Sequence, residues 1–234
     1  MDLHETVSVC KDLAVAAGAA VMEIYAGDFS VALKSDKSPL TLADTVSNDI
    51  IISGLQKKFH NCAVLSEESR DDPSRLKNDY CFVVDPLDGT KEFVSRSGQF
   101  TVNIALSYKN GTGGEIKISV SDRLEGLVAV SSKSHLGERE ERLLKENARL
   151  IARTVYAGSS IKGCMVARGV ADVYYRFGPT CEWDVAAMHC VVEQAGGVFR
   201  RADAAAMRYN RRDTLNSKGF FAVNRPENIW TLNE

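Results

Sequence analysis

Residues 81 to 93 read Cys81-Phe-Val-Val-Asp-Pro-Leu-Asp-Gly-Thr-Lys-Glu-Phe93. The apolar run at the start of this stretch predicts a buried strand that carries Asp85 at its end. Pro86 has no N–H to give to a neighbouring strand, so we expect the strand to stop there. Asp88 follows within one tight turn. Two carboxylates should therefore emerge close together from one rigid strand end.

The residues after Asp85 offer several oxygen ligands. Gly89 can adopt the positive φ that such a turn often needs, and Thr90 presents a hydroxyl, either as a helix cap or toward whatever the carboxylates hold. With the free backbone carbonyl of Leu87, this set suits a hard divalent cation. The alternative is a strand followed by an ordinary Asp-Gly turn. The whole hexapeptide behind an apolar strand favours the cation site.

Composition limits the class of protein. A chain of 234 residues can bury a sizeable core, as one large domain or as two closely packed halves. The net charge of −2 argues against a nucleic-acid-binding surface, while local positive charge could still serve a small anionic substrate. No apolar run approaches the ~20 residues of a membrane span, and the first residues lack the pattern of a signal peptide.

The six cysteines are scattered and form no CxxC pair. Several lie inside apolar patterns, which is typical of buried, reduced thiols in a cytosolic protein. No Cys/His spacing offers a tetrahedral set, so zinc is not expected. We expect a cytoplasmic protein without a transmembrane segment.

Further acidic residues occur where predicted elements begin or end. Asp44 falls three residues after Thr41, the expected N-cap of a helix over 39–59, and on its own is explained as a capping-box carboxylate. Glu67 and Glu68 follow the short apolar strand 63–65. Adjacent glutamates usually lie on a solvated surface, but this placement lets one of them point into the same site. Asp184 is expected to cap a helix over 185–195.

The other predicted elements follow from apolar periodicity and turn residues. We expect helices at 7–24, 138–149 and 158–170, the second of them mostly exposed to solvent. Strands are predicted at 29–33, 100–106, 116–120, 127–131, 171–177, 198–200 and 220–223. At the start of helix 158–170, Ser159 and Lys162 suit a phosphate group, although a capped helix with an exposed lysine is an equally good explanation.

These motifs, in this order, resemble the signature set of the inositol monophosphatase superfamily. Glu67-Glu68, Asp85-Pro-Leu-Asp-Gly-Thr90 and Trp183-Asp184 with a Gly-Gly pair downstream carry the resemblance. Within that superfamily, Lys91-Glu-Phe93, Gly98 to Leu106, Ser132-Lys-Ser-His135 and Arg176 to Thr180 resemble the CysQ-type branch. Proteins of that branch are 3′(2′),5′-bisphosphate nucleotidases.

The resemblance implies an α+β layered fold, an αβαβα sandwich like that of inositol monophosphatase and fructose-1,6-bisphosphatase. It implies a single phosphatase unit over 1–234, with a metal-loop half at about 1–130 and a substrate-binding half at about 131–234. It also implies two or three Mg²⁺ ions, inhibition by Li⁺ and the capacity to form a homodimer. The resemblance alone also allows peripheral association of the protein with the cytoplasmic face of the membrane.

Carried onto this sequence, the resemblance assigns three groups of residues. The metal ligands would be Glu67, Asp85, the carbonyl of Leu87, Asp88 and Asp184. The catalytic residues would be Asp44, Thr90 and Glu67, with Thr90 orienting or helping to deprotonate the attacking water. The substrate-binding residues would be Glu67, Leu87, Asp88, Gly89, Thr90, His135, Ser159, Lys162, Arg176 and Asp184.

The expected reaction is removal of the 3′-phosphate of adenosine 3′,5′-bisphosphate, and of its sulfated form, by metal-activated water. An inositol monophosphatase or broad sugar-phosphate phosphatase is the alternative, and a non-catalytic regulatory protein of the same fold is a third.

One departure from the family pattern is the short stretch 107–114, where members usually have another pair of strands. We interpret it as a missing segment, because deleting paired strands would expose sheet edges.

Overall fold

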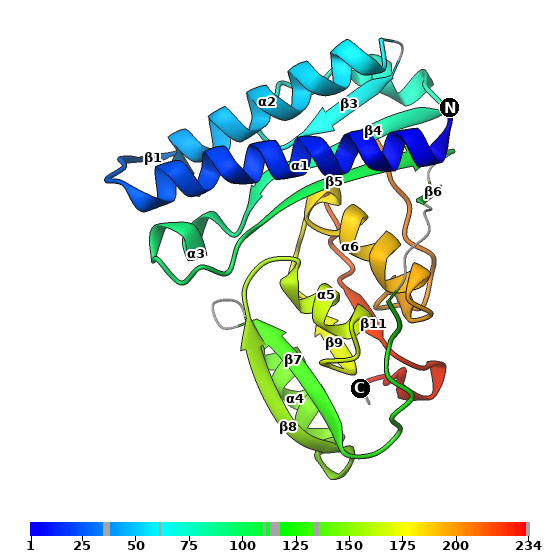
Figure 1. Ribbon diagram of the computed structural model, residues 1–234. Coiled ribbons are helices and arrows are strands. Elements are labelled where there is room, and N and C mark those ends of the chain that lie inside the picture. The colour runs from blue at the N-terminus through cyan, green and yellow to red at the C-terminus, as the bar shows by residue number, and fades with distance from the viewer. Residues whose placement is uncertain (35–37, 61, 110, 113–117, 133–135, 233–234) are drawn as a thin grey trace.

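The computed structural model describes residues 1–34, 38–60, 62–109, 111–112, 118–132 and 136–232. Helices and sheets alternate in five layers, in the order helix, sheet, helix, sheet, helix (Figure 1). The αβαβα sandwich expected from the sequence is therefore confirmed. No helix among the described residues is long and apolar enough to cross a membrane. All six cysteines are free thiols, as predicted, but only Cys81 is buried and the other five are partly exposed.

The first layer holds α1 (Leu3–Ala26) and α2 (Leu42–Lys58), close to the predicted helices. Thr41 caps α2, and the carboxylate of Asp44 completes the predicted capping box. A short antiparallel hairpin of β1 (Val31–Leu33) and β2 (Pro39–Thr41) precedes α2. The expected helix start at residue 39 is wrong, because Pro39 to Thr41 pair with β1.

The first sheet has the order β3-β4-β5-β6. Its strands are β3 (Ala63–Ser66), β4 (Tyr80–Asp88), β5 (Thr101–Tyr108) and β6 (Gly111–Thr112). The prediction that β4 stops at Pro86 is wrong, since the strand continues to Asp88. A register irregularity between Asp85 and Asp88 interrupts the pairing with β5, so the missing N–H of Pro86 breaks no ladder there.

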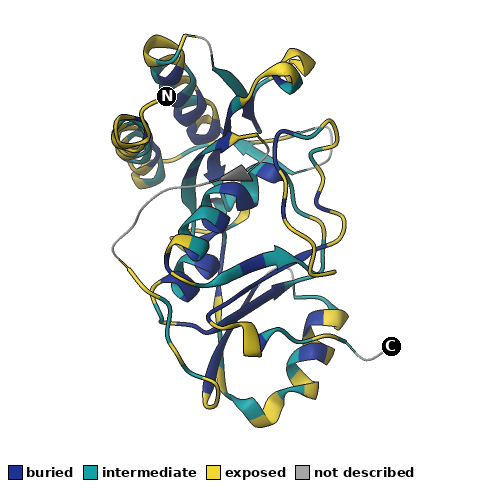
Figure 2. Cartoon of the chain, turned by 90° about the vertical axis from the view of Figure 1, so that its right-hand side faces the viewer, coloured by how far each residue is buried: buried dark blue, intermediate teal, exposed yellow. Residues whose placement is uncertain are grey.

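Both faces of this sheet are covered, which explains the unbroken apolar run before Asp85. Phe82 and Val84 pack with Ile51 and Leu55 of α2. On the opposite face, Cys81, Val83 and Ala105 join the large core formed with the middle helices. Those helices are α5 (Ile161–Ala167) and α6 (Glu182–Gln194), and α5 is shorter than the predicted helix 158–170. The buried faces of the elements point inward and the exposed faces outward (Figure 2).

The second sheet has the order β10-β11-β9-β7-β8. Its strands are β7 (Leu127–Ser132), β8 (Ile151–Ala157), β9 (Val173–Arg176), β10 (Val198–Arg201) and β11 (Phe220–Val223). Strand β8 was not predicted from the sequence. This strand lies at a sheet edge with most of its residues partly exposed, so its sequence shows no clear apolar alternation.

The outermost layer is α4 (Glu138–Glu146), followed by the short 3₁₀ helix η2 (Ala148–Leu150). α4 is less exposed than predicted, because Leu143 packs on the second sheet and Glu140 is buried. The prediction of a strand at 116–120 is wrong for residues 118–120, which have no regular secondary structure. Residues 116–117 lie outside the described part.

Three short helices complete the chain: α3 (Thr90–Val94), η1 (Pro73–Lys77) and η3 (Pro226–Asn228). The first sheet is built from residues 63–112 and the second from residues 127–223. The division into halves near residue 130 stays a prediction, as does the missing strand pair near 107–114.

Candidate functional site

Three predicted metal ligands converge at one place. Single carboxylate oxygens of Glu67, Asp85 and Asp184 all lie within 4.8 Å of one another. Glu67 follows β3, Asp85 lies in β4, and Asp184 is the third residue of α6. Because β3 and β4 are parallel neighbours, their carboxyl ends meet at one edge of the first sheet, and α6 begins beside that edge.

The environment of these carboxylates disfavours their ionised forms. Burial raises the pKa of Asp184 to about 8, and the charge of Asp88 adds to this shift. Burial also raises the pKa of Asp85 well above its ordinary value, and three neighbouring carboxylates contribute. Grouped, buried carboxylates that repel one another need a compensating positive charge when they ionise. The donor set is entirely oxygen, so it fits a hard divalent cation such as Mg²⁺.

Asp88 lies beside this cluster but is not one of its three members. Its Oδ2 accepts hydrogen bonds from the Ser160 N–H at 2.6 Å, Asn103 Nδ2 at 3.2 Å and Thr101 Oγ1 at 3.4 Å. Burial raises the pKa of Asp88, although Lys162 and the hydrogen bonds from Ser160 and Asn103 oppose the shift. All three bonds reach the same oxygen.

Gly89 adopts the positive φ that the sequence predicts, whereas the alternative that Thr90 caps a helix is wrong, because Gly89 is the N-cap of α3 and Thr90 is its first residue. Gly89 has a φ of 95°, and α3 begins directly after it. The Thr90 hydroxyl makes close contacts to Asp44 Oδ1 at 3.1 Å and to the Leu87 carbonyl at 3.2 Å. The Leu87 carbonyl is therefore not free as expected, but a hydroxyl carries one hydrogen, so Asp44 and this carbonyl compete for it, and the carbonyl keeps its lone pairs whenever the hydrogen points to Asp44. Asp44 itself is buried, and its Oδ2 accepts from the Thr41 N–H and hydroxyl at 2.7 Å each.

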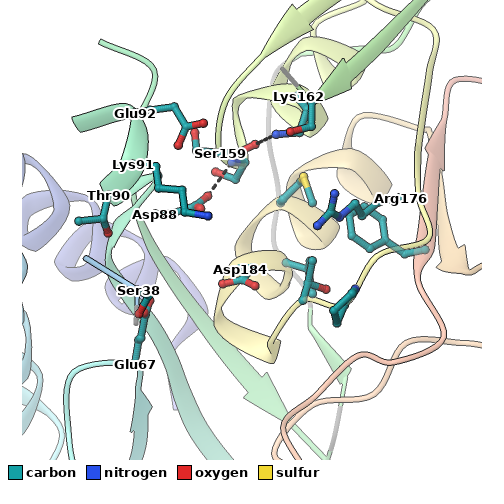
Figure 3. Close-up of a pocket in the computed structure, with 18 of the residues that line it drawn as sticks. Ser38, Glu67, Asp88, Thr90, Lys91, Glu92, Ser159, Lys162, Arg176 and Asp184 are labelled. Atoms are coloured by element: carbon teal, nitrogen blue, oxygen red, sulfur yellow. Dashed lines mark hydrogen bonds between the residues drawn. The ribbon is translucent and has the colours of Figure 1, made fainter. Parts of the chain in front are cut away.

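A cavity of about 260 Å³ opens between the carboxylates and the second sheet. Figure 3 shows Glu67, Asp88 and Thr90 on one side of it, Lys162 and Arg176 on the other, and Asp184 between them. Gly89 and Ser159 also line it, together with Tyr174, Met188 and Phe220. The cavity thus has an acidic wall, with Glu67 and Asp88, and a basic wall, with Lys162 and Arg176.

The basic wall contains a desolvated lysine. Lys162 is 5% exposed, and its Nζ donates to the Ser159 carbonyl at 2.7 Å and lies 5.4 Å from the centre of the Tyr174 ring. Burial lowers the pKa of Lys162 to about 8, although the charges of Asp88 and Glu92 oppose the shift. The alternative of an exposed lysine on a capped helix is therefore wrong.

The role of Lys34 beside the acidic wall was not predicted. Lys34 Nζ pairs with Glu67 at 2.7 Å and also with Glu68. Of these two glutamates, Glu67 belongs to the carboxylate cluster and Glu68 does not. Burial alone would lower the pKa of Lys34, but its hydrogen bonds to the two glutamates raise it overall. Nothing in the local sequence around Lys34 signals this role.

Asn103 was also not predicted. Its alternation with Val102 and Ile104 would place the amide on the solvent face of a half-buried strand, but both faces of this sheet are covered, so Asn103 is buried and needs partners. Its partners are Asp88 and Ser160, whose hydroxyl binds Asn103 Oδ1 at 2.9 Å. His135, expected to bind substrate, lies outside the described residues.

The chain was compared with known proteins. The model of the inositol monophosphatase family matches residues 2–120 and 110–232. The 3′(2′),5′-bisphosphate nucleotidase CysQ of Salmonella typhimurium is 35% identical over 243 residues, covering 91% of this chain and 96% of that protein. CysQ of Escherichia coli K12 is 36% identical over the same shares.

The structural comparison agrees. A crystal structure of CysQ from Bacteroides thetaiotaomicron, described as a bacterial member of the inositol monophosphatase family, has a TM-score of 0.80 and 31% identity. The match covers 94% of this chain and 98% of the CysQ chain in that structure. The resemblance drawn from the motifs, including its CysQ-type features, is thereby confirmed. The chain belongs to the inositol monophosphatase family.

Proposed function

We propose that this chain is a Mg²⁺-dependent phosphomonoesterase that removes the 3′-phosphate of adenosine 3′,5′-bisphosphate. The observation that carries the proposal is the cavity that Glu67, Asp88 and Asp184 line together with Lys162 and Arg176, next to the converging carboxylates of Glu67, Asp85 and Asp184. A substrate with two phosphates can place the reacting one at the carboxylates and the other at the basic wall. The relatives named as bisphosphate nucleotidases support this choice of substrate.

Glu67, Asp85 and Asp184 would hold the cation, and Asp88 faces the same space. A bound divalent cation would supply positive charge to the phosphate oxygens and to the leaving alkoxide. The arrangement of the carboxylates then sets where the reacting phosphate lies. A second cation would use Asp88 together with one of the three clustered carboxylates.

Thr90 and Asp44 would act on the attacking water. With the Thr90 hydrogen directed at Asp44, the Thr90 oxygen retains lone pairs that can accept a hydrogen from a water in the cavity. As that water attacks, its proton can pass to Thr90 while the Thr90 proton moves to Asp44. The pair thus orients the water and provides a route for its proton.

Lys162 and Arg176 would bind the phosphate that is not transferred. Both line the cavity, and they lie close enough for the charge of Arg176 to contribute to the lowered pKa of Lys162. Two cations next to each other repel unless an anion lies between them or beside them. A phosphate with two negative charges would relieve this repulsion.

The deciding experiment compares kcat/KM for adenosine 3′,5′-bisphosphate and for inositol 1-phosphate at saturating Mg²⁺. We expect the bisphosphate to be preferred. A tenfold or greater preference for inositol 1-phosphate would instead assign the chain to the inositol monophosphatase activity. Asp88→Asn should abolish hydrolysis of either substrate while the protein stays folded, and unchanged turnover in that variant would exclude the metal assignment.

A further inference from the structure

Glu182 is a fully buried acid outside the cavity. It is the first residue of α6, two positions before Asp184, and it is 0% exposed. Its Oε2 accepts from the Asn210 N–H at 2.6 Å, its Oε1 accepts from the Arg211 N–H at 3.0 Å, and the Arg211 side chain pairs with it at 3.0 Å. A buried carboxylate is costly unless it is bonded in this way.

Arg75 is the second buried charge of the same network. It lies in η1, which connects β3 to β4, and is 2% exposed. Its Nη1 donates to Asn210 Oδ1 at 2.8 Å and its Nη2 donates to the Arg211 carbonyl at 2.9 Å. In return, Asn210 Nδ2 donates to the Arg75 carbonyl at 3.1 Å. Asp71 pairs with Arg75 at 2.6 Å on the exposed side.

The segment between Asn210 and Asn216 also binds the backbone around the start of α6. The Glu182 N–H donates to the Thr214 carbonyl at 3.0 Å. Asn216 donates its N–H to the Thr180 carbonyl at 2.7 Å and its side-chain amide to the Cys181 carbonyl at 2.9 Å. The first turn of α6, which carries Asp184, is therefore held by residues 210–216, none of which lines the cavity.

We infer that Arg75, Asn210 and Glu182 form a positioning network that sets where Asp184 lies relative to Glu67 and Asp85. The two parts of the chain that it joins are those that supply the clustered carboxylates. The connection through β3, η1 and β4 carries Glu67 and Asp85, and α6 carries Asp184. None of the three network side chains lines the cavity, so they act through Asp184 and not on substrate.

This inference rests on the proposed metal site, and it predicts a defect in cation binding beyond any loss of stability. Residues that orient metal ligands commonly change metal affinity by about 10–100-fold when they are replaced. Since this network acts through the first turn of α6, we expect the lower end, about tenfold.

The test uses two variants and one matched control. Asn210→Gly removes the side-chain bonds to Arg75 and keeps the backbone unstrained, because Asn210 has a φ of 57°. Arg75→Lys keeps the charge but loses the forked contacts with Asn210 and Arg211. Ala204→Gly is the control, since Ala204 has a φ of 62° in the same region and is exposed.

Mn²⁺ binding to the substrate-free proteins is measured by isothermal titration calorimetry, with circular dichroism as the check on folding. We expect Kd to rise about tenfold in Asn210→Gly and Arg75→Lys and to stay within twofold in Ala204→Gly. At saturating Mg²⁺, KM for the substrate should remain within twofold in all three. The Mg²⁺ concentration for half-maximal activity should rise with the Mn²⁺ Kd.

Three results would overturn the inference. Mn²⁺ affinity within twofold of wild type in both network variants, with only a lower Tm, would make the network purely structural. Loss of folding in both variants would assign the network to global stability. If the wild-type chain bound no Mn²⁺, the proposed metal site would itself be contradicted, which separates that failure from a failure of the network.

Discussion

The Thr90 hydroxyl lies 3.1 Å from Asp44 Oδ1, joining the start of α3 to the first turn of α2. The contact gives Asp44 two partners, because its other oxygen closes the capping box of α2. The same carboxylate can therefore support helix α2 and receive a proton from Thr90. These two roles can be separated by mutation.

Thr90→Val should lower kcat by about 10²–10⁴-fold, because it removes the hydroxyl that we propose orients the attacking water. Thr90→Ser should keep most of the activity. Neither variant touches the capping box. Thr90→Ser should leave Tm nearly unchanged, whereas Thr90→Val also removes the hydrogen bond to the buried Asp44 Oδ1 and should cost about 1–3 kcal/mol of stability. Asp44→Asn should lose comparable activity and also about 1 kcal/mol of stability through the weakened cap. Steady-state kinetics and thermal melts check these outcomes, and near-normal kcat in Thr90→Val would exclude a catalytic role for Thr90.

Because Lys162 lies in the basic wall, we expect KM to depend on the number of phosphates in the substrate and kcat/KM to depend on pH. Lys162→Ala should raise KM for a bisphosphate more than for a monophosphate, because only the former has a phosphate for this lysine. Since burial lowers the pKa of Lys162 to about 8, its positive charge is lost as the pH rises through 8. In wild type, kcat/KM for the bisphosphate should therefore fall above that pH.

Lys162→Arg is the matched variant for this prediction. An arginine stays protonated above pH 8. In the Lys162→Arg variant, kcat/KM for the bisphosphate should therefore not fall above pH 8. Equal effects of Lys162→Ala on bisphosphate and monophosphate would show that Lys162 does not contact the second phosphate.

Without a bound cation, the clustered carboxylates should make stability fall with pH. The pKa of Asp184 is raised from 3.8 to about 8 by burial first and by Asp88 second, so the folded chain keeps a proton that the unfolded chain has lost. This contribution is fully present below about pH 4 and is lost as the pH rises to about 8. Between these limits the slope is about 1.4 kcal/mol per pH unit for each such proton.

Thermal melts of the metal-free protein from pH 5 to 8 test this sign, with Asp184→Asn as the control that removes the titrating group. Mg²⁺ should raise Tm more at pH 8 than at pH 6, because the ionised carboxylates bind it better. A Tm increment from Mg²⁺ that does not depend on pH would contradict the prediction.

Gly89 should tolerate no side chain. Gly89→Ala places a Cβ 3.0 Å from the Gln99 carbonyl and 3.3 Å from Ser159 Cβ, at a φ of +95°. Gly98 has a φ of +71° with nothing within 4 Å of an added Cβ, so Gly98→Ala measures the cost of the positive φ alone, about 1–2 kcal/mol. Denaturant unfolding should show a larger loss for Gly89→Ala. Equal losses would mean that the close approach of Gln99 has no energetic effect.

The local sequence was sufficient for much of this protein. The strand that carries Asp85, the cap of α2 by Thr41 and the positive φ of Gly89 all follow from interactions between near neighbours. A helix after Asp184 was also predicted, but it begins at Glu182, so the prediction that Asp184 is its cap is wrong and Asp184 is the third residue of α6. The order of the acidic motifs was also enough to identify the family. Periodicity, turn chemistry and capping are short-range effects, so a single sequence reports them directly.

Contacts between residues far apart in the chain were decided only by the tertiary structure. The edge strand β8 and the pairing of Pro39 to Thr41 depend on partners that local patterns do not reveal. The pairing of Lys34 with Glu67 and the link from Arg75 through Asn210 to Glu182 join segments that carry no mutual signal. The segment that begins at Asp85 was expected to bind a cation, and the fold places Glu67 and Asp184 beside Asp85. Burial there raises the pKa values of Asp85 and Asp184, because desolvation depends on the whole packed structure and not on the neighbouring residues in sequence.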